Sequence, residues 1–310
     1  MKLQLTTIAA AVSLTLSGAV FAQSTIPATT NLNGNVNWGV DNANYGEDGD
    51  AWRNINPSYD SSTSFSSARQ SLNSIPSATS GTEQNLETTT QDGTNNSAST
   101  VQSNTDNRSF IDQTGNGHFA DTDQSGAQNY SRVTQNLGNG GVVNTLQEGS
   151  YNSSVVEQYG GDYNGADVSQ SGSTNTSVIL QGGIGGGADN NSAYVIQTGE
   201  NNKSYIGQTY GDSNVATATQ SGEFGTSYII QRGYDNEATL TQNMDASYNE
   251  SYILQDNVSY NQAGHYAKVT QGGGSENITT VTQLGQAQAT AHSTVTQTGG
   301  GGNQASVLQY

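Results

Sequence analysis

The sequence predicts an all-β fold, a two-sheet β-solenoid (cross-β) built from strand–turn–strand rungs, with a disordered N-terminal segment. Three observations predict it. Nineteen glutamines recur between Gln91 and Gln309, usually eleven or twelve residues apart, and fourteen of them follow an asparagine by six residues. Glycine stands two residues after thirteen of the eighteen glutamines that have a following repeat. Only 31% of the 310 residues are apolar, too few for an ordinary globular core, so regular stacking must supply the order.

The N-terminal part of the chain lacks this period. Residues 1–22 combine Lys2, an apolar stretch over residues 8–16 and the small-residue site Val20-Phe21-Ala22, which predicts a secretory signal peptide. Residues 23–84 are rich in Asn, Ser, Thr and Gly and keep no period of 3.6 or 2, which predicts disorder. This segment could serve export targeting or surface display, or be a plain spacer.

Residues 85–310 form the predicted repeat domain. Counted backwards from each glutamine, site −6 is mostly Asn, site −4 is small and site −2 is mostly aliphatic. Positions two apart on a strand share one face, so these sites and the glutamine are predicted to point inward. The inward glutamines, proposed as the polymerisation core, are Gln102, Gln113, Gln124, Gln135, Gln147, Gln158, Gln170, Gln181, Gln197, Gln208, Gln220, Gln231, Gln242, Gln255, Gln271, Gln283, Gln297 and Gln309. The inward asparagines are Asn96, Asn107, Asn129, Asn152, Asn164, Asn175, Asn191, Asn202, Asn214, Asn236, Asn249, Asn277 and Asn303.

Site −4 alternates between Ser and Ala through most of the array, so two strands make one repeat. Nineteen strands then give about nine to ten rungs. Each stacked amide has a donor and an acceptor and can bond the amides above and below it. A buried amide without a partner costs roughly 1–3 kcal/mol, which explains the strict spacing.

The outward sites differ between the two kinds of strand. At site −3 the Ser-type strands carry an apolar stripe, whereas the Ala-type strands are mostly polar there. This pattern indicates a wall for lateral bundling or surface binding, or cross-strand pairs that only strengthen the sheet. The outward apolar stripe is Phe110, Val155, Val178, Tyr205, Tyr228 and Tyr252.

Composition excludes several function classes. The net charge is −18 with eight Lys and Arg, which argues against nucleic acid or an anionic membrane as partner. Cysteine is absent, so disulfides, zinc–thiolate sites and thiol nucleophiles are excluded. Beyond the signal, no segment could span a bilayer as a helix, and no membrane insertion is expected.

Candidate chemistry is sparse. His118 and His265 occupy site −6, where a polar stand-in for Asn is favoured over a metal ligand because no further ligands cluster nearby. The acidic turn over residues 161–167 is better interpreted as solvated loop charge than as a calcium site. Carboxylates are scattered without a nucleophile, base and orienting group. We therefore expect no enzyme activity, no cofactor and no metal.

The repeat resembles the curlin repeat, the unit of bacterial curli fibres. That unit looks like Ser-x5-Gln-x-Gly-x4-Asn-x-Ala-x3-Gln. Gln113-Thr-Gly115 with Ala120 and Gln124, and Gln208 with Asn214, Ala216 and Gln220, reproduce its spacing. The resemblance covers residues 85–310. The chain departs from that pattern in three ways. It has about twice the usual number of rungs, and its Ser-type strands begin with Asn where the pattern usually has Ser. It also has long turns at residues 182–190 and 256–264.

The resemblance implies a structural subunit of extracellular, curli-like functional amyloid fibres for biofilm matrix and adhesion. It further implies passage through the periplasm and an outer-membrane export pore, a nucleator subunit as partner, and homopolymerisation by edge templating. Two alternatives stay open: a nucleator or minor subunit, and a monomeric β-solenoid adhesin or ice-binding module. The latter should show a flat array of outward threonines.

Overall fold

The computed structural model describes residues 84–182, 188–243, 247–257, 264–285 and 290–309. The expected signal peptide, residues 1–22, lies outside the described residues, as does all but the last residue of the segment 23–84. Parts of the two long turns, residues 183–187 and 258–263, also lie outside them.

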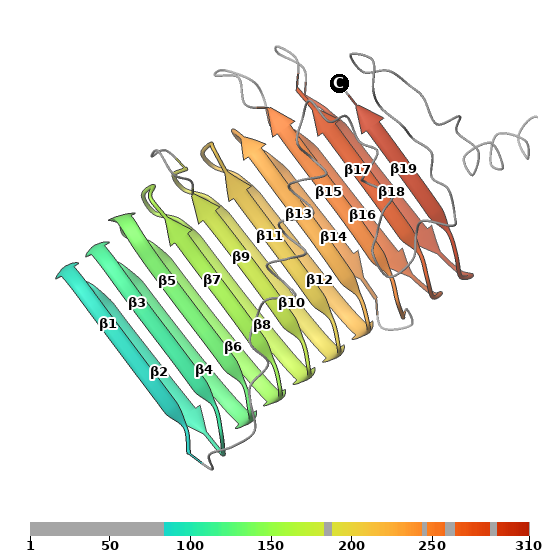
Figure 1. The fold of residues 1–310 in the computed structure, drawn as a ribbon. Helices are drawn as coiled ribbons and strands as arrows, with labels where there is room; N and C mark the ends of the chain where they lie inside the picture. The colour runs from blue at the N-terminus through green and yellow to red at the C-terminus, as the bar shows by residue number, and fades with distance from the viewer. Residues whose placement is uncertain (1–83, 183–187, 244–246, 258–263, 286–289, 310) are drawn as a thin grey trace, which may run out of the picture. The chain divides into compact units, whose positions relative to one another are not determined.

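The described residues form nineteen strands in two parallel sheets and contain no helix (Figure 1), so the predicted two-sheet β-solenoid is confirmed. The ten-stranded sheet holds, in spatial order, β1 (Leu86–Thr94), β3 (Arg108–Asn116), β5 (Tyr130–Asn139), β7 (Ser153–Tyr159), β9 (Thr176–Gly182), β11 (Lys203–Thr209), β13 (Thr226–Gly233), β15 (Glu250–Asn257), β17 (Ile278–Leu284) and β19 (Gln304–Gln309). The nine-stranded sheet holds β2 (Ser97–Ser103), β4 (Phe119–Ala127), β6 (Val142–Ser150), β8 (Gly165–Ser173), β10 (Ser192–Glu200), β12 (Val215–Glu223), β14 (Glu237–Gln242), β16 (Tyr266–Gly272) and β18 (His292–Thr298).

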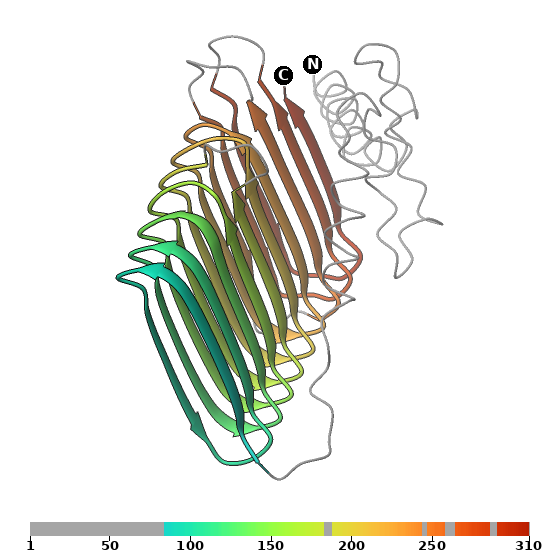
Figure 2. The same cartoon turned by 60° about the vertical axis from the view of Figure 1, so that its left-hand side comes forward.

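Successive strands alternate between the sheets, so each pair of strands makes one rung, with turns along both edges (Figure 2). Neighbouring rungs are in register, and glutamine stands beside glutamine, as in Gln208↔Gln231 and Gln197↔Gln220. One irregularity, between Thr114 and Asn116 of β3, shifts its pairing with β5. The repeat therefore places equivalent residues in columns along the stack.

The core lies between the two sheets and is a set of such columns. Burial alternates along the strands: in β10 the residues Ala193, Val195 and Gln197 are buried between exposed or half-buried neighbours. Branched residues such as Ile206 and Ile229 fill site −2, and Ala or Ser at site −4 lets the sheets approach closely. β-Branched side chains suit a pleated, buried surface, which is why these short segments form strands despite the polar composition.

Candidate functional site

The repeated glutamines line the interior from one end of the solenoid to the other. Of the eighteen predicted positions, all are buried except Gln102 and Gln309, which are half-buried. Gln91, on β1, is exposed. The glutamines of the ten-stranded sheet form one column, and those of the nine-stranded sheet form a second.

Each glutamine amide bonds the amide of the next rung. In the column of the ten-stranded sheet, nine Nε2–H···Oε1 bonds of 2.6–2.9 Å join the described residues from Gln91 to Gln309 without a break. In the other column, eight bonds of 2.7–2.9 Å join Gln102 to Gln297. These distances are those of good hydrogen bonds, and a buried donor that lost its partner would cost about 1–3 kcal/mol.

The second hydrogen of each amide ties the two sheets together, which sequence reasoning missed. Gln208 of β11 donates to the carbonyl of Ser192 in β10 at 2.9 Å, and Gln220 of β12 donates to the carbonyl of Lys203 in β11 at 3.0 Å. The same bond recurs along both columns. Glutamine is long enough to reach across the interior, so one residue type satisfies both the stacking and the cross-sheet contacts.

All of these amide bonds run in one direction. The lower-numbered glutamine donates and the higher-numbered one accepts, as in Gln181 to Gln208 and Gln208 to Gln231. Within the described part of the chain, no donor reaches Oε1 of Gln91 or Gln102, and the amides of Gln297 and Gln309 have no further glutamine to bond. One end of the solenoid therefore presents amide acceptors and the other presents amide donors.

The asparagines act differently from the simple amide columns that the sequence predicted. Asn107 Oδ1 accepts the main-chain N–H of Asn129 on the next rung at 3.0 Å. Its Nδ2 donates to the carbonyls of Ser103 (2.8 Å) and Gly126 (2.9 Å). Each such asparagine thus holds the turn before it and the turn of the next rung. Amide-to-amide bonds occur only in places, as from Asn214 to Asn191 at 2.9 Å.

Most of the predicted asparagines are buried in this way, and the rest lie near the two ends of the stack. Asn96 and Asn303 are half-buried. Asn107, Asn129, Asn152, Asn164, Asn175, Asn191, Asn202, Asn214, Asn236, Asn249 and Asn277 are buried. The column is interrupted where Gly141, Gly225 and Ala291 occupy site −6.

The backbone conformation of the residue before each asparagine is a second feature that the sequence did not reveal. This residue has a left-handed backbone, with φ of 59° at Tyr151, 58° at Thr174 and 55° at Tyr248. This conformation is unfavourable for bulky and β-branched residues, so the bonds of the following asparagine must hold it. Because its residue type varies from Gly to Tyr, no pattern in the sequence marks this position.

Part of the repeat array matches a known family of repeats. Residues 188–222 match the family model described as the curlin associated repeat. The chain carries a curlin associated repeat. A search of the curated proteins gives no match.

The matched residues cover β10, β11 and all but the last residue of β12, and they include residues that make each kind of contact described above. Gln208 lies at their centre and bonds Gln181, Gln231 and two carbonyls. The same contacts recur on rungs outside the matched residues. The geometry of the matched residues therefore recurs along the whole described solenoid.

The predicted outward stripe lies on the outer face of the ten-stranded sheet. Phe110 and Val155 are half-buried, whereas Val178, Tyr205, Tyr228 and Tyr252 are buried. The rings of Tyr228 and Tyr252 stack with centroids 5.1 Å apart and planes within 4°. Burial raises the pKa of Tyr205 to about 12. Contacts between neighbouring strands, of the kind that strengthen a sheet, are therefore present along this stripe.

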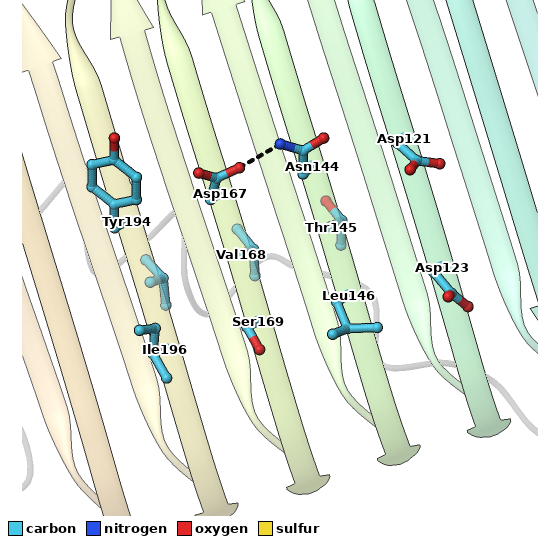
Figure 3. A pocket seen from close by; sticks show the side chains of 11 residues that line it. Asp121, Asp123, Asn144, Thr145, Leu146, Asp167, Val168, Ser169, Tyr194 and Ile196 are labelled. Atoms are coloured by element: carbon cyan, nitrogen blue, oxygen red, sulfur yellow. Dashed lines mark hydrogen bonds between the residues drawn. The ribbon is translucent and has the colours of Figure 1, made fainter.

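The outer face of the nine-stranded sheet differs from what the sequence predicted. The outer face of the nine-stranded sheet was expected to be polar, but Leu146, Tyr194 and Ile196 are exposed there at 38–45%. With Asp167 they line a shallow groove of about 470 Å³, in which Asn144 donates to Asp167 at 2.6 Å (Figure 3). The expectation was wrong for this part of the wall because Tyr194 is an exception at site −3, and because it took no account of site −1 on these strands, where Leu146 and Ile196 stand.

The two predicted histidine positions take over the asparagine role. His118 and His265 are buried, and the Nδ1 of each accepts a main-chain N–H from the next rung. Among the described residues, no group of three or more His, Cys, Asp or Glu side chains is arranged to hold a metal ion. None of the described residues forms a helix long and apolar enough to cross a membrane.

Proposed function

We propose that this curlin-repeat protein is a structural, non-catalytic subunit of extracellular curli-like amyloid fibres, which grow by stacking copies end to end. The direction of the glutamine columns supports the proposal. The acceptor end at Gln91 and Gln102 complements the donor end at Gln297 and Gln309, so head-to-tail stacking would continue both columns. Stacking in any other sense would place donor against donor or acceptor against acceptor.

The outermost strands support growth in the same direction. Among the described strands, β1 pairs only with β3 and β18 only with β16, so each presents a row of unpaired main-chain groups. Natural proteins usually protect such edges because they recruit further strands. An added copy would satisfy both the main-chain groups and the amide columns, as in cross-β fibres. The net charge of −18 would keep unassembled chains apart.

The remaining parts of the proposal rest on the curlin repeat. They are secretion through the periplasm and an outer-membrane pore, a nucleator subunit as partner, and a role in biofilm matrix and adhesion. A nucleator role for the chain itself is the nearest alternative. Seeding separates the two, because a bulk subunit extends its own fibres, whereas a nucleator accelerates a different chain and contributes little mass.

The structure also favours a second candidate, a surface-binding face such as an ice-binding one. On β12, β14, β16 and β18, seven of the eight outward residues at sites −3 and −1 are threonine, and they stand in register. Lys268 is the eighth. The threonines are Thr217, Thr219, Thr239, Thr241, Thr270, Thr294 and Thr296.

One experiment tests both candidates. The chain without residues 1–22 is diluted from denaturant and followed by circular dichroism, dye binding and fibre diffraction. We expect fibres with a meridional spacing of about 4.7–4.8 Å that seed fresh chains. A β-rich monomer that stays soluble for days would contradict the fibre proposal. If that monomer also inhibited ice recrystallisation, the threonine face would carry the function instead.

We expect Glu87→Ser to speed fibre growth at the β1 end by roughly tenfold or more, because an incoming strand would otherwise bury an unpaired carboxylate. Glu87 stands in the small inward site, in register with Ser109, and is exposed on β1. Growth at the two ends is measured by two-colour labelling of seeds and added chains. Glu237→Ser, an exposed outward change on β14, removes the same charge and is the control. Equal acceleration by both variants would mean that net charge alone sets the rate.

A further inference from the structure

Two of the three histidines of the chain replace asparagine in one interior column. His118 begins the β4 repeat and His265 begins the β16 repeat. The main-chain N–H groups of the two histidines donate to Asn96 Oδ1 and Asn236 Oδ1, both at 3.0 Å. The two imidazoles are almost fully buried, with 3% and 2% exposed. They therefore lie within the hydrogen-bonded interior and not on its surface.

Both imidazoles make the same bond to the following rung. The Nδ1 of His118 accepts the N–H of Gly141, and the Nδ1 of His265 accepts the N–H of Ala291, each at 3.2 Å. In both cases the next residue of the column is one without an amide side chain. An imidazole nitrogen can accept only while it carries no proton, so both bonds require neutral histidine.

Both histidine bonds lie near an end of the nine-stranded sheet. The nine-stranded sheet runs from β18 and β16 at one end to β4 and β2 at the other. The histidine-bearing strands, β16 and β4, are thus each next to the last described strand. Of the strands between them, β6 is preceded by Gly141, and β8 to β14 are preceded by asparagines, none of which titrates. The asparagines are Asn164, Asn191, Asn214 and Asn236.

The surroundings favour the neutral form. Burial lowers the pKa of His118, and the Thr114 carbonyl and the Asp162 carboxylate oppose this only in part. Burial likewise lowers the pKa of His265. The Asp256 carbonyl opposes this lowering, whereas His292 on β18 lowers the pKa of His265 further. The Arg232–Asp256 pair, at 3.9 Å, lies on the outer face of the ten-stranded sheet. The Nε2 atoms of both histidines are buried without a partner of good geometry among the described residues.

The direction of the pH effect follows from these shifts. The unfolded chain has ordinary histidines with a pKa near 6.5, and the folded chain has lower values. The unfolded state therefore binds more protons in mild acid. The stability that the two histidines confer is complete above pH 6.5 and is lost as the pH falls from 6.5 toward their folded pKa values.

We propose that His118 and His265 form a pH-sensitive switch, which keeps the outer strands of the nine-stranded sheet ordered at neutral pH and loosens them in mild acid. Protonation breaks the bonds to Gly141 and Ala291 and leaves a buried charge at each site. The consequence for fibre growth rests on the proposed function, because the loosened strands are those nearest the ends that would receive another copy. The local opening itself does not depend on fibre formation.

The test measures amide protection and histidine titration in the assembled or soluble β-rich chain. Nitrogen-15 spectra follow the three imidazoles, and hydrogen exchange, corrected for its intrinsic pH dependence, follows the amides of Gly141 and Ala291. We expect their protection to fall by up to about tenfold for each pH unit between 6.5 and the folded pKa, and to fall no further below it. Gly225, whose N–H is held by Asn202 Oδ1 at 2.9 Å in the equivalent slot, should keep its protection.

Matched variants separate the switch from general acid effects. The Asn202–Gly225 pair shows that asparagine serves this slot before a small residue, so His118→Asn and His265→Asn should keep the bonds and remove the pH dependence. His292→Asn, an exposed change, should keep the pH dependence at both sites and remove only the small contribution of His292 to the lowered pKa of His265. Equal pH dependence at Gly141, Ala291 and Gly225, or persistence of the effect in His118→Asn/His265→Asn, would overturn the proposal. Absence of fibres with normal switching would contradict only the proposed function.

Discussion

Replacing Gly172 by alanine is expected to lower the free energy of unfolding of the solenoid by roughly 3 kcal/mol or more, or to prevent its folding. Gly172 is the second-last residue of β8 and has φ of +104°, a backbone conformation that residues with a Cβ rarely adopt. An added Cβ would also collide with the carbonyl oxygen of Gly199 on the next rung. That oxygen belongs to the main chain and cannot move aside as a flexible side chain could. Denaturant unfolding followed by circular dichroism measures the loss.

The control for this substitution lies in the same strand. Gly165→Ala makes the same chemical change, but the nearest atom to the added Cβ would be Ser192 Oγ at 4.0 Å. That is an ordinary van der Waals distance, so the Cβ fits without a clash. We expect its effect to stay within about 0.5 kcal/mol, as for an ordinary surface change. If the two variants unfolded at the same denaturant concentration, the stacked glycine turns would not hold the rungs together.

The fold follows from the sequence because each rung repeats the same inward residues. The spacing of Gln113, Gln135 and Gln158 fixes the length of a rung, and in-register pairing then leaves one arrangement of the strands. Ser109 and Ala120 identify the two kinds of strand, which the structure assigns to the two sheets. A period of two along each strand decides which side chains face inward. Neither step needs knowledge of a tertiary contact.

The asparagine contacts could not be predicted in the same way. Asn107 bonds main-chain groups whose positions depend on the turn before it. That turn contains a left-handed residue, which is Asp106 here and Tyr151 or Phe224 elsewhere. Residue type does not mark this conformation, so the sequence indicates an inward polar side chain but not its partners. The cross-sheet bonds of the glutamines were missed for a related reason, because they depend on the distance between the sheets.

The outer walls show a further limit of sequence reasoning. The stripe from Phe110 to Tyr252 was found from site −3 alone. On the nine-stranded sheet, Leu146 and Ile196 stand at site −1, and the in-register threonines from Thr217 onward combine both sites. An outward face is a two-dimensional surface, so its character emerges only when several strands are placed side by side.

Gln208→Glu is expected to destabilise the solenoid by about 3–5 kcal/mol, although it changes neither the size nor the shape of the side chain. Gln208 is fully buried and accepts from Gln181 at 2.9 Å. Its amide hydrogens serve Gln231 Oε1, the Ser192 carbonyl and the Asn214 carbonyl, each at 2.9 Å. A carboxylate has no hydrogen to donate, so these three oxygens would face a buried negative charge. The loss is measured by denaturant unfolding and by the half-time of assembly.

Thr219→Glu isolates the cause, because it adds the same charge at a half-buried outward site on the neighbouring β12. Its carboxylate stays in contact with water, so we expect a change within about 0.5 kcal/mol. The contrast distinguishes the two ways in which an acidic substitution acts. Added net charge slows the encounter of copies in both variants and weakens with salt, whereas lost amide donors act only at Gln208 and persist in salt. Equal destabilisation of the two variants would show that the interior amide columns do not carry the fold.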